Sequence, residues 1–294
     1  MTDPAAPRIR LHEDEILFRE AVGFTAARTG FAARLIEKDY FCAVILEYLA
    51  AAAPGLVFKG GTCLAKIHAG FYRLSEDMDY VIPVDPHVTR SKRSELAAGV
   101  RDAARVLARA LPVFRAAAPF RGSNDSTQYC GSFAYTSPTS AQEETIKLEV
   151  GLREPLLESA VTAPARSILL DPVSGGALVP EVPARCMSLR EAIAEKVRAA
   201  LTRRGVAIRD FYDIDFAVVR LGVRPDDAAL LDLVRKKLAV PGNAPVDVGD
   251  ERLGELRAQL STRLRPVLRA RDYEAFDLER AITAVVGIAG AVGA

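Results

Sequence analysis

Apolar residues recur at helical spacing through the first fifty residues of the chain. This pattern predicts one helix over residues 13–29, which ends at Gly30, and a second over residues 32–53, which ends at Pro54-Gly55. The apolar run "LVFK", residues 56–59, predicts a short buried strand. A further helix is expected to start at Thr62 and to run through "CLAKIHAGF". The segment "DMDYVIPV", residues 77–84, alternates like a strand.

The middle of the chain mixes one helical pattern with strand patterns. Residues 91–111 predict an amphipathic helix, which Gly-, Ser- and Asn-rich turns follow. Strands are expected in "YCGSFAYT" and "TIKLEVGL". Residues 153–184 are rich in Pro, Gly and Ser, and predict an irregular connector with one or two short strands.

From Ser188 onward the pattern is almost entirely helical. "SLRE" fits a capping box, in which Ser188 accepts from first-turn amides and Glu191 reaches back. Helices are predicted over 188–204, 208–221, 225–239, 250–270 and 272–289. The sequence therefore predicts an α+β protein with a mixed domain over residues 1–184 and a helical domain over residues 185–294.

The amino-acid composition indicates which broad class of protein this is. The chain has 294 residues, of which 50% are hydrophobic and 26% charged, as in a globular protein of one or two domains with a sizeable core. The net charge of +1 favours no acidic partner, so nucleic-acid contacts would depend on local basic patches.

The cysteines and the two ends of the chain bear on its location. The four cysteines show no CxxC pairing and no adjacent histidines, which predicts reduced thiols in a cytosolic protein instead of a zinc site or a disulfide framework. The N-terminal segment lacks the apolar core of a signal peptide. The apolar C-terminal run is shorter than the ~20 residues that span a bilayer. We therefore expect a cytoplasmic protein without a membrane contact.

Two aspartates stand one residue apart in "DMDY". A strand would place Asp77 and Asp79 on one face, with Met78, Tyr80 and Ile82 facing the core. Two carboxylates that close repel each other unless a cation or proton lies between them. Oxygen ligands of this kind suit Mg²⁺, which completes its shell with phosphate oxygens. The alternative is a solvated acidic end of a strand.

Gly60, Gly61 and Thr62 stand where a strand gives way to a helix. Glycine allows a ligand to approach the backbone, amides at a helix start attract phosphate, and Thr62 adds a hydroxyl. The alternative is a simple turn. Neither the Walker pattern GxxxxGK[ST] nor GxGxxG is present.

Further charged candidates lie downstream. In "TIKLEVGL", Glu149 would complete a three-carboxylate cluster if its strand neighboured Asp77 and Asp79, or would belong to an exposed Lys/Glu face of an edge strand. Lys196 and Arg203 share one helix face, and so do Asp210 and Asp213. Their apolar surroundings favour a site over a solvated surface. Lys196 could neutralise a triphosphate, and Asp213 could orient that lysine or accept a proton.

Together these residues resemble the AbiEii family of nucleotidyltransferase-like toxins from type IV abortive-infection toxin–antitoxin systems. "EKDY" resembles that family's helix before the active-site strand. "FKGGT" followed by "RLSEDMD" resembles its first motif, and "KLEV" its second, K-x-D-like motif. "KVRAALTR" and "DFYD" resemble its third and fourth motifs. Glu149 stands where the family pattern has Asp, so that ligand would reach one methylene further.

The resemblance implies a polymerase-β-like nucleotidyltransferase fold, a small mixed sheet with helices followed by a helical domain. It implies that Asp77 and Asp79 bind Mg²⁺, with Glu149 as a third metal ligand, and that Lys196 and Asp213 are essential for catalysis. The nucleotide would be held by Lys59, Gly60, Gly61, Thr62, Arg73, Ser75 and Arg203. The reaction would transfer a nucleotidyl group from an NTP and release pyrophosphate.

The acceptor and the partners follow only by analogy. Related toxins of this fold add nucleotides to tRNA 3′ ends, so tRNA is the favoured acceptor and a cognate antitoxin the expected partner. Basic clusters that could follow a phosphate backbone comprise Arg198, Arg203, Arg204, Arg209, Arg263, Arg265, Arg269 and Arg271.

Two alternatives to the toxin reading stay open. One is a nucleotidyltransferase of the same fold that acts on a small molecule or a protein. The other is a nucleotide-binding module with little catalysis. Ser75 is either a turn hydroxyl or a switch, because a group attached there would repel the triphosphate.

Overall fold

The computed structural model describes residues 8–293. The chain forms two compact units. Within the described residues, the first unit comprises 8–156 and 160–187, and the second comprises 157–159 and 188–293.

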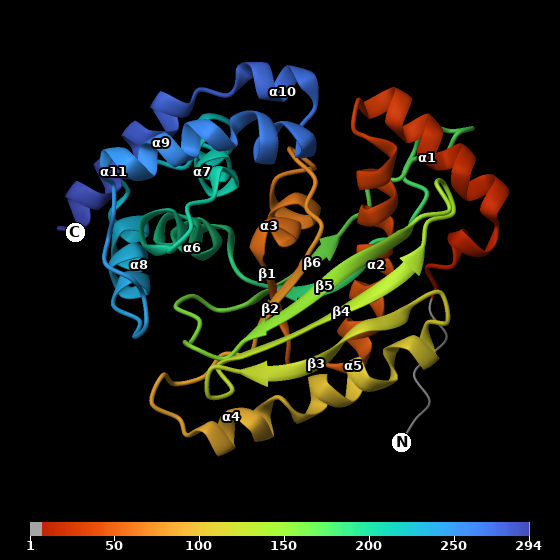
Figure 1. Cartoon of the computed structure of the whole chain (residues 1–294), viewed down its shortest axis with the longest axis horizontal. Coiled ribbons are helices and arrows are strands. Elements are labelled where there is room, and N and C mark those ends of the chain that lie inside the picture. The colour runs from red at the N-terminus through yellow and green to blue at the C-terminus, as the bar shows by residue number, and fades with distance from the viewer. Residues whose placement is uncertain (1–7, 294) are drawn as a thin grey trace. The chain divides into compact units, whose positions relative to one another are not determined.

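The first unit is built on a seven-stranded mixed sheet (Figure 1). Its strands are β1 (Val57–Lys59), β2 (Met78–Val81), β3 (Arg115–Ser123), β4 (Gln128–Thr136), β5 (Glu143–Gly151), β6 (Val161–Ala165) and β7 (Val182–Cys186). The order across the sheet is β3-β4-β5-β2-β1-β7-β6. The pairs β2–β5 and β1–β7 are parallel, and the other pairs are antiparallel. The two predicted strands at 129–136 and 145–152 are confirmed within two residues. The one or two short strands expected in the connector are β6, which lies inside it, and β7, which begins at its end.

The first unit also contains helices, and a capping residue and a glycine set the two ends of the first α-helix. The helices are the 3₁₀ turn η1 (Leu11–Glu13), α1 (Glu15–Thr29), α2 (Ala33–Ala52), α3 (Gly60–Cys63), the π-helical turn η2 (Leu64–His68), α4 (Arg90–Leu96) and α5 (Ala98–Ala110). Asp14 caps α1, and Gly30 ends it with a positive φ of 81°, as the sequence predicts. The short helix α3 begins at Gly60, two residues before the expected start at Thr62.

The core of the first unit lies between α2 and one face of the sheet. The middle of α2 is buried on all sides, and its Phe41 ring lies 4.0 Å from the ring of Tyr135 on β4. On β5, Ile146, Leu148 and Val150 are fully buried. The predicted register of this strand is therefore confirmed, and it turns Lys147 and Glu149 to the opposite face.

Two further features of this unit differ from the sequence prediction. The single helix expected over 91–111 is two helices, α4 and α5, because the backbone at Ala97 has a ψ of −4°. The sequence also predicts turns where β3 lies. This strand is exposed along almost its whole length, so it carries no alternation of buried and polar residues, and only its pairing with β4 defines it.

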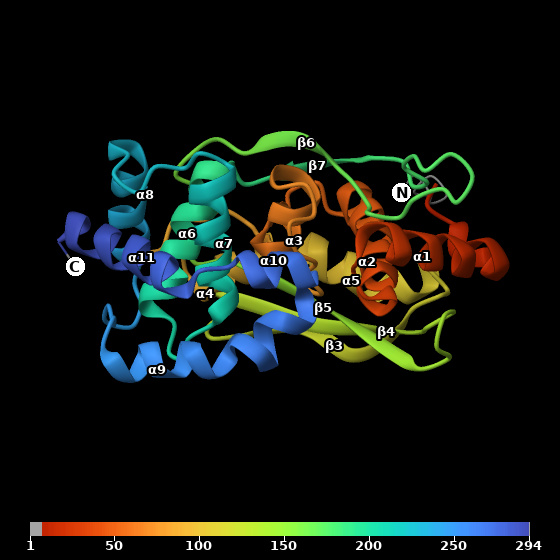
Figure 2. The same cartoon turned by 90° about the horizontal axis from the view of Figure 1, so that it is seen from above.

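The second unit is helical, apart from the short segment Leu157–Ser159. Its elements are α6 (Leu189–Thr202), α7 (Ile208–Arg220), α8 (Ala228–Leu238), α9 (Asp250–Gln259), the π turn η3 (Leu260–Leu264), the 3₁₀ turn η4 (Arg265–Val267), α10 (Ala270–Ala275) and α11 (Leu278–Val292). Helix α6 packs against α7, α8 and α11 (Figure 2). The long helix predicted over 250–270 is broken near Pro266, which has no backbone N–H to continue the helical ladder.

The predicted capping box at Ser188 is half correct. Ser188 Oγ accepts a hydrogen bond from the amide of Glu191 at 3.1 Å, as expected. The Glu191 carboxylate, however, accepts from the amides of Leu157 and Glu158 and forms a fully buried ion pair of 2.8 Å with Lys237 of α8. This buried charge pair takes Glu191 away from the reciprocal bond and joins α6 to α8 instead.

Among the described residues, no helix is long and apolar enough to cross a membrane.

Candidate active site

Asp79 lies at the centre of a polar row that crosses the sheet. It pairs with Lys59 of β1 on one side and with Glu149 of β5 on the other. Glu149 in turn pairs with Cys130 of β4. Directly opposed residues point to the same face, and neighbouring strands lie about 4.8 Å apart. The tertiary structure therefore places Glu149 beside Asp79. From the sequence, this proximity depended on whether the two strands are neighbours in the sheet.

Asp77 lies immediately before β2, because the strand begins at Met78. Met78 is fully buried, whereas Asp77 and Asp79 are half-buried, so the two carboxylates flank a core residue. The hydroxyl of Thr62 donates to the backbone oxygen of Asp77 at 2.5 Å. This bond ties the glycine loop to the start of the aspartate strand.

Gly60 is the point at which the loop touches Asp79. Its φ is +75°, a conformation that side chains rarely adopt. A Cβ at this position would lie 2.3 Å from Asp79 Oδ2 and 2.9 Å from Asp79 Cβ. Glycine is therefore required here both by the backbone conformation and by the close approach of the carboxylate.

Gly61 is approached in the same way by Arg73 and Ser75, two other candidate nucleotide-binding residues. A Cβ at Gly61 would lie 2.4 Å from Arg73 Nη2 and 3.0 Å from Ser75 Oγ. The Arg73 side chain is buried, and its guanidinium donates to the backbone oxygen of Leu74 at 3.3 Å. The structure thus brings Arg73 and Ser75 against the loop that the sequence assigns to the nucleotide. Because α3 is only four residues long, close backbone approach explains the glycines better than a helix dipole does.

Glu149 is held by its neighbours. Its Oε2 lies 2.6 Å from Lys147 Nζ, and its Oε1 accepts from the side-chain amide of Gln128 at 2.7 Å. Burial alone would raise the pKa of Glu149, but the hydrogen bonds and charges of these partners outweigh it, so the pKa is lowered. A metal ion bound by Glu149 would have to displace Lys147 from Oε2.

The second unit gathers the four charged residues of its motifs into one network. Lys196 Nζ on α6 lies 2.9 Å from Asp210 Oδ1 and 2.9 Å from Asp213 Oδ2 on α7. Arg203 Nη1 lies 3.1 Å from Asp210 Oδ2. Asp213 is fully buried and Lys196 mostly so, whereas the Arg203 side chain is 55% exposed. The two aspartates therefore fix the position of the lysine ammonium.

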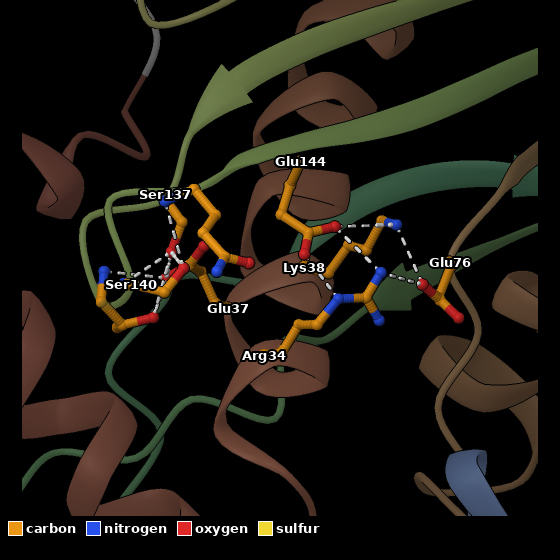
Figure 3. Close-up of polar contacts among 9 residues, drawn as sticks. Arg34, Glu37, Lys38, Glu76, Ser137, Ser140 and Glu144 are labelled. Atoms are coloured by element: carbon orange, nitrogen blue, oxygen red, sulfur yellow. Dashed lines mark hydrogen bonds and ion pairs between the residues drawn. The ribbon is translucent and has the colours of Figure 1, made fainter.

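Three consecutive residues of α2, Glu37, Lys38 and Asp39, are buried charges for which the sequence predicts no role. Figure 3 shows two of them, Glu37 and Lys38, together with Arg34. Glu37 Oε2 accepts from Ser137 Oγ at 3.0 Å and from Thr139 Oγ1 at 2.5 Å, in the loop between β4 and β5. Lys38 Nζ lies 2.9 Å from Glu76 Oε2 and 3.5 Å from Glu144 Oε2. Lys38 thereby anchors the residue that precedes Asp77.

Asp39 is the third of these charges. It forms an ion pair of 2.7 Å with Lys66 of η2, and both side chains are almost completely buried. Its other oxygen accepts from Ser167 Oγ and from the amide of Ile168, each at 3.0 Å. Charged residues within an apolar helical run are the sequence signal for such contacts, because isolated buried charges are too costly to leave unpaired.

Comparison with known proteins gives the following matches. A family model described as "Nucleotidyl transferase AbiEii toxin, Type IV TA system" matches residues 44–282. The comparison with curated protein sequences found no match.

The solved structures that resemble the chain include the following three. Protein JHP933 and a putative nucleotidyltransferase, both from Helicobacter pylori, each have a TM-score of 0.52, and each similarity covers 89% of this chain. Their identities are 17% and 16%, and 93% and 96% of their own chains are covered. MenT4, a nucleotidyltransferase toxin from Mycobacterium tuberculosis, has 16% identity and a TM-score of 0.40, with 91% of this chain and 98% of its own covered. The two Helicobacter structures confirm the fold predicted from the sequence.

Proposed function

Because the chain belongs to the AbiEii family of nucleotidyltransferase toxins of type IV toxin–antitoxin systems, we propose that it transfers a nucleotidyl group from an NTP to the 3′ end of tRNA. In this reaction an acceptor hydroxyl attacks the α-phosphorus, a new phosphodiester bond forms, and pyrophosphate leaves. The observation that carries the proposal is the contact of Gly60 with Asp79, which joins the glycine loop to the acidic strand. Residues 1–184 would be the nucleotidyltransferase domain and residues 185–294 a helical domain.

Asp77 and Asp79 are the proposed Mg²⁺ ligands. Two half-buried carboxylates on either side of a core residue fit an ion that takes one or two protein carboxylates and completes its shell with phosphate oxygens. Bound Mg²⁺ would supply positive charge at the α-phosphate and lower the pKa of the attacking hydroxyl. Glu149 beside Asp79 would be a third ligand once Lys147 released it.

The loop and its neighbours are the proposed triphosphate site. Gly60 and Gly61 leave the backbone accessible, and Arg73 and Ser75 lie directly against Gly61. Lys59, which pairs with Asp79 in the sheet, adds a positive charge. Lys196, held by Asp210 and Asp213, would neutralise phosphate charge, and Arg203 would assist it.

Acceptor contacts are proposed for the exposed arginines of the second unit. Arg204, Arg263 and Arg265 are exposed. Arg198 and Arg269 are held in ion pairs, with Glu195 and Asp272 respectively. Arg271 is also exposed, but its guanidinium lies 3.8 Å from the carboxylate of Asp272. Arg204, Arg263 and Arg265 are therefore the better candidates for phosphate contacts. A cognate antitoxin is the expected partner from the family.

The test uses purified protein with Mg²⁺, each α-labelled NTP in turn, and total tRNA. We expect label at tRNA 3′ ends, and a loss of about a hundredfold or more in Asp79→Asn and Lys196→Met. The matched controls are Asp232→Asn and Lys236→Met, which alter an exposed ion pair on α8 and should keep full activity.

The outcomes separate the alternatives. Label on the protein itself or on a small molecule would favour a nucleotidyltransferase of the same fold that acts on a protein or a small molecule instead of tRNA. NTP binding without pyrophosphate release would favour a binding module. Label on tRNA that persists in Asp79→Asn would refute the assignment of the site.

A further inference from the structure

Three side chains that the proposed reaction does not use meet inside the first unit. Cys63, His68 and Cys186 each offer one ligand atom, and these atoms all lie within 4.8 Å of one another. Both cysteines are completely buried, and His68 is half-buried. Two thiols and an imidazole at this separation are a ligand set that soft divalent metals prefer.

The π-helical turn η2 explains why Cys63 and His68 meet although they are five residues apart. In an α-helix of 3.6 residues per turn, positions five apart point about 140° away from each other. In η2 the hydrogen bonds join residues five apart, as between the amide of Ala69 and the oxygen of Leu64 at 2.7 Å. This wider turn returns residue 68 to the side of residue 63.

Cys186 reaches the same point from the sheet. It is the last residue of β7 and pairs with Phe58 of β1, five residues before Cys63. The backbone bond from the amide of Met187 to the oxygen of Phe58, at 3.0 Å, fixes the end of this strand. The three ligands therefore come from two segments far apart in sequence that the fold holds together.

The hydrogen bond of His68 leaves its other nitrogen available. His68 Nε2 lies 3.0 Å from the backbone oxygen of Met187. A carbonyl oxygen can only accept, so Nε2 carries the proton, and in the neutral ring Nδ1 keeps its lone pair. Donation from one ring nitrogen to a backbone carbonyl is the usual way in which a metal-binding histidine is oriented.

The two thiols are in direct contact. The Cys63 thiol donates to Cys186 and lowers the pKa of the Cys186 thiol. Burial raises the pKa of Cys63.

We propose that Cys63, His68 and Cys186 form a binding site for one thiophilic divalent cation, of which Zn²⁺ is the typical example. Three protein ligands leave the fourth position of a tetrahedral shell to water or another small donor. Metal binding releases the thiol protons and cross-links the end of α3 to the end of β7. Because Cys63 directly follows Thr62, this cross-link also makes the glycine loop more rigid.

The test is titration of the metal-free, fully reduced protein with Co²⁺, followed by competition with Zn²⁺. We expect one Co²⁺ per chain, with a thiolate-to-metal charge-transfer band and the visible bands of tetrahedral cobalt, both of which Zn²⁺ removes. Cys63→Ser, Cys186→Ser and His68→Gln should each weaken binding at least tenfold, in line with the loss of a metal ligand or its support. His68→Gln keeps a donor for the oxygen of Met187 and so preserves the fold.

The matched control is Cys42→Ser. Cys42 is also completely buried, but its thiol lies 4.0 Å from the backbone oxygen of Glu76 and does not belong to the group formed by Cys63, His68 and Cys186. This variant should keep the cobalt spectrum and the increase in melting temperature with Zn²⁺. Circular dichroism verifies that every variant is folded.

Three results would overturn the proposal. They are a cobalt spectrum without charge transfer, a spectrum that survives in folded His68→Gln and Cys186→Ser, and oxidation of Cys63 and Cys186 to a disulfide by diamide with no metal bound in the reduced protein. None of these readouts depends on nucleotidyl transfer, so the outcome is independent of the proposed function.

Discussion

At the scale of single residues, the glycines of the loop are the sharpest constraint. Gly60 combines a positive φ with a Cβ position occupied by Asp79, whereas Gly61 has only the second feature, against Arg73. Gly70 has only the first, with a φ of +63° and open space around it. Substitutions at these three glycines therefore allow the effect of backbone strain to be measured separately from the effect of steric overlap.

We expect Gly70→Ala to cost about 1–2 kcal/mol of stability, the cost of a left-handed conformation for an L-residue, and to leave NTP binding unchanged. Gly60→Ala should cost more and should also abolish binding, because Asp79 must move. Gly61→Ala should weaken NTP binding without the strain cost. Thermal unfolding and equilibrium NTP binding measure the two effects. Equal behaviour of Gly60→Ala and Gly70→Ala would show that the contact with Asp79 is irrelevant.

A second prediction at this scale concerns the pH dependence at Glu149. Its pKa is lowered in the folded protein because Lys147 and Gln128 outweigh burial. A depressed carboxylate pKa stabilises the fold above the unfolded-state pKa, and this stability is lost as the pH falls through the folded-state pKa. Lys147→Met should therefore lower the melting temperature most at neutral pH, and the difference from wild type should disappear in acid.

The control for this pH effect is a double-mutant cycle. In a Glu149→Gln background, Lys147→Met no longer removes the charge that lowers the pKa of Glu149, so most of the pH dependence of its effect should disappear. A pH-dependent effect in that background would assign the titration to another group. Both series need only melting temperatures over a range of pH.

At the scale of secondary-structure elements, buried charges on α2 fix the parts that carry the site. Lys66 and Asp39 join η2, α2 and the segment around Ile168 through one ion pair and two further hydrogen bonds. Lys38 holds Glu76, the residue before Asp77. Helix α2 thus orients η2, which follows the glycine loop, and the segment that leads into β2.

Removal of one partner of the buried pair should be costly. Lys66→Met leaves Asp39 charged in the core, so we expect a loss of about 3–5 kcal/mol in the free energy of unfolding. The double variant Lys66→Met with Asp39→Asn should recover part of this loss, because asparagine keeps an acceptor oxygen for Ser167 and Ile168. Urea unfolding followed by circular dichroism measures both values.

The reference for that experiment is the exposed pair of Lys236 and Asp232 on α8, with side chains 56% and 53% exposed. Lys236→Met should change stability by no more than about 0.5 kcal/mol. If Lys66→Met cost no more than this surface variant, the buried pair would have no role in holding α2 and η2 together.

At the scale of the whole molecule, the charge of the chain is almost balanced, so acceptor binding must depend on local patches. Arg204, Arg263 and Arg265 are exposed in the second unit. Each replacement by alanine should weaken tRNA binding and lower the slope of log affinity against log salt by up to about 0.7–0.9, while NTP binding stays unchanged.

Arg105→Ala is the matched control for the arginine series. Arg105 is also exposed, but it lies on α5 of the first unit and pairs with Asp102. It should leave the salt slope unchanged. A slope that falls equally for Arg105→Ala and Arg263→Ala would indicate non-specific attraction instead of a binding surface.

The sequence by itself determines which elements form and what chemistry they carry. Period-two alternation in residues 145–152 fixes which side chains of β5 are buried, and Gly30 and Pro54-Gly55 fix where the first two helices end, because these are local properties of the backbone. The charged motifs resemble those of the AbiEii family in sequence and order, and this resemblance indicates a nucleotidyltransferase. Local patterns do not reveal β3, which is exposed and is defined only by its pairing with β4.

Only the tertiary structure decides which of these residues meet. The pairing of β2 with β5 places Glu149 beside Asp79, and the packing of α6 on α7 places Lys196 between two aspartates. The sequence argues against a zinc site because its cysteines are scattered, yet a π-helical turn and the end of β7 bring Cys63, His68 and Cys186 together. The physical reason is that sheet register and helix packing depend on contacts between distant segments, which local spacing cannot specify.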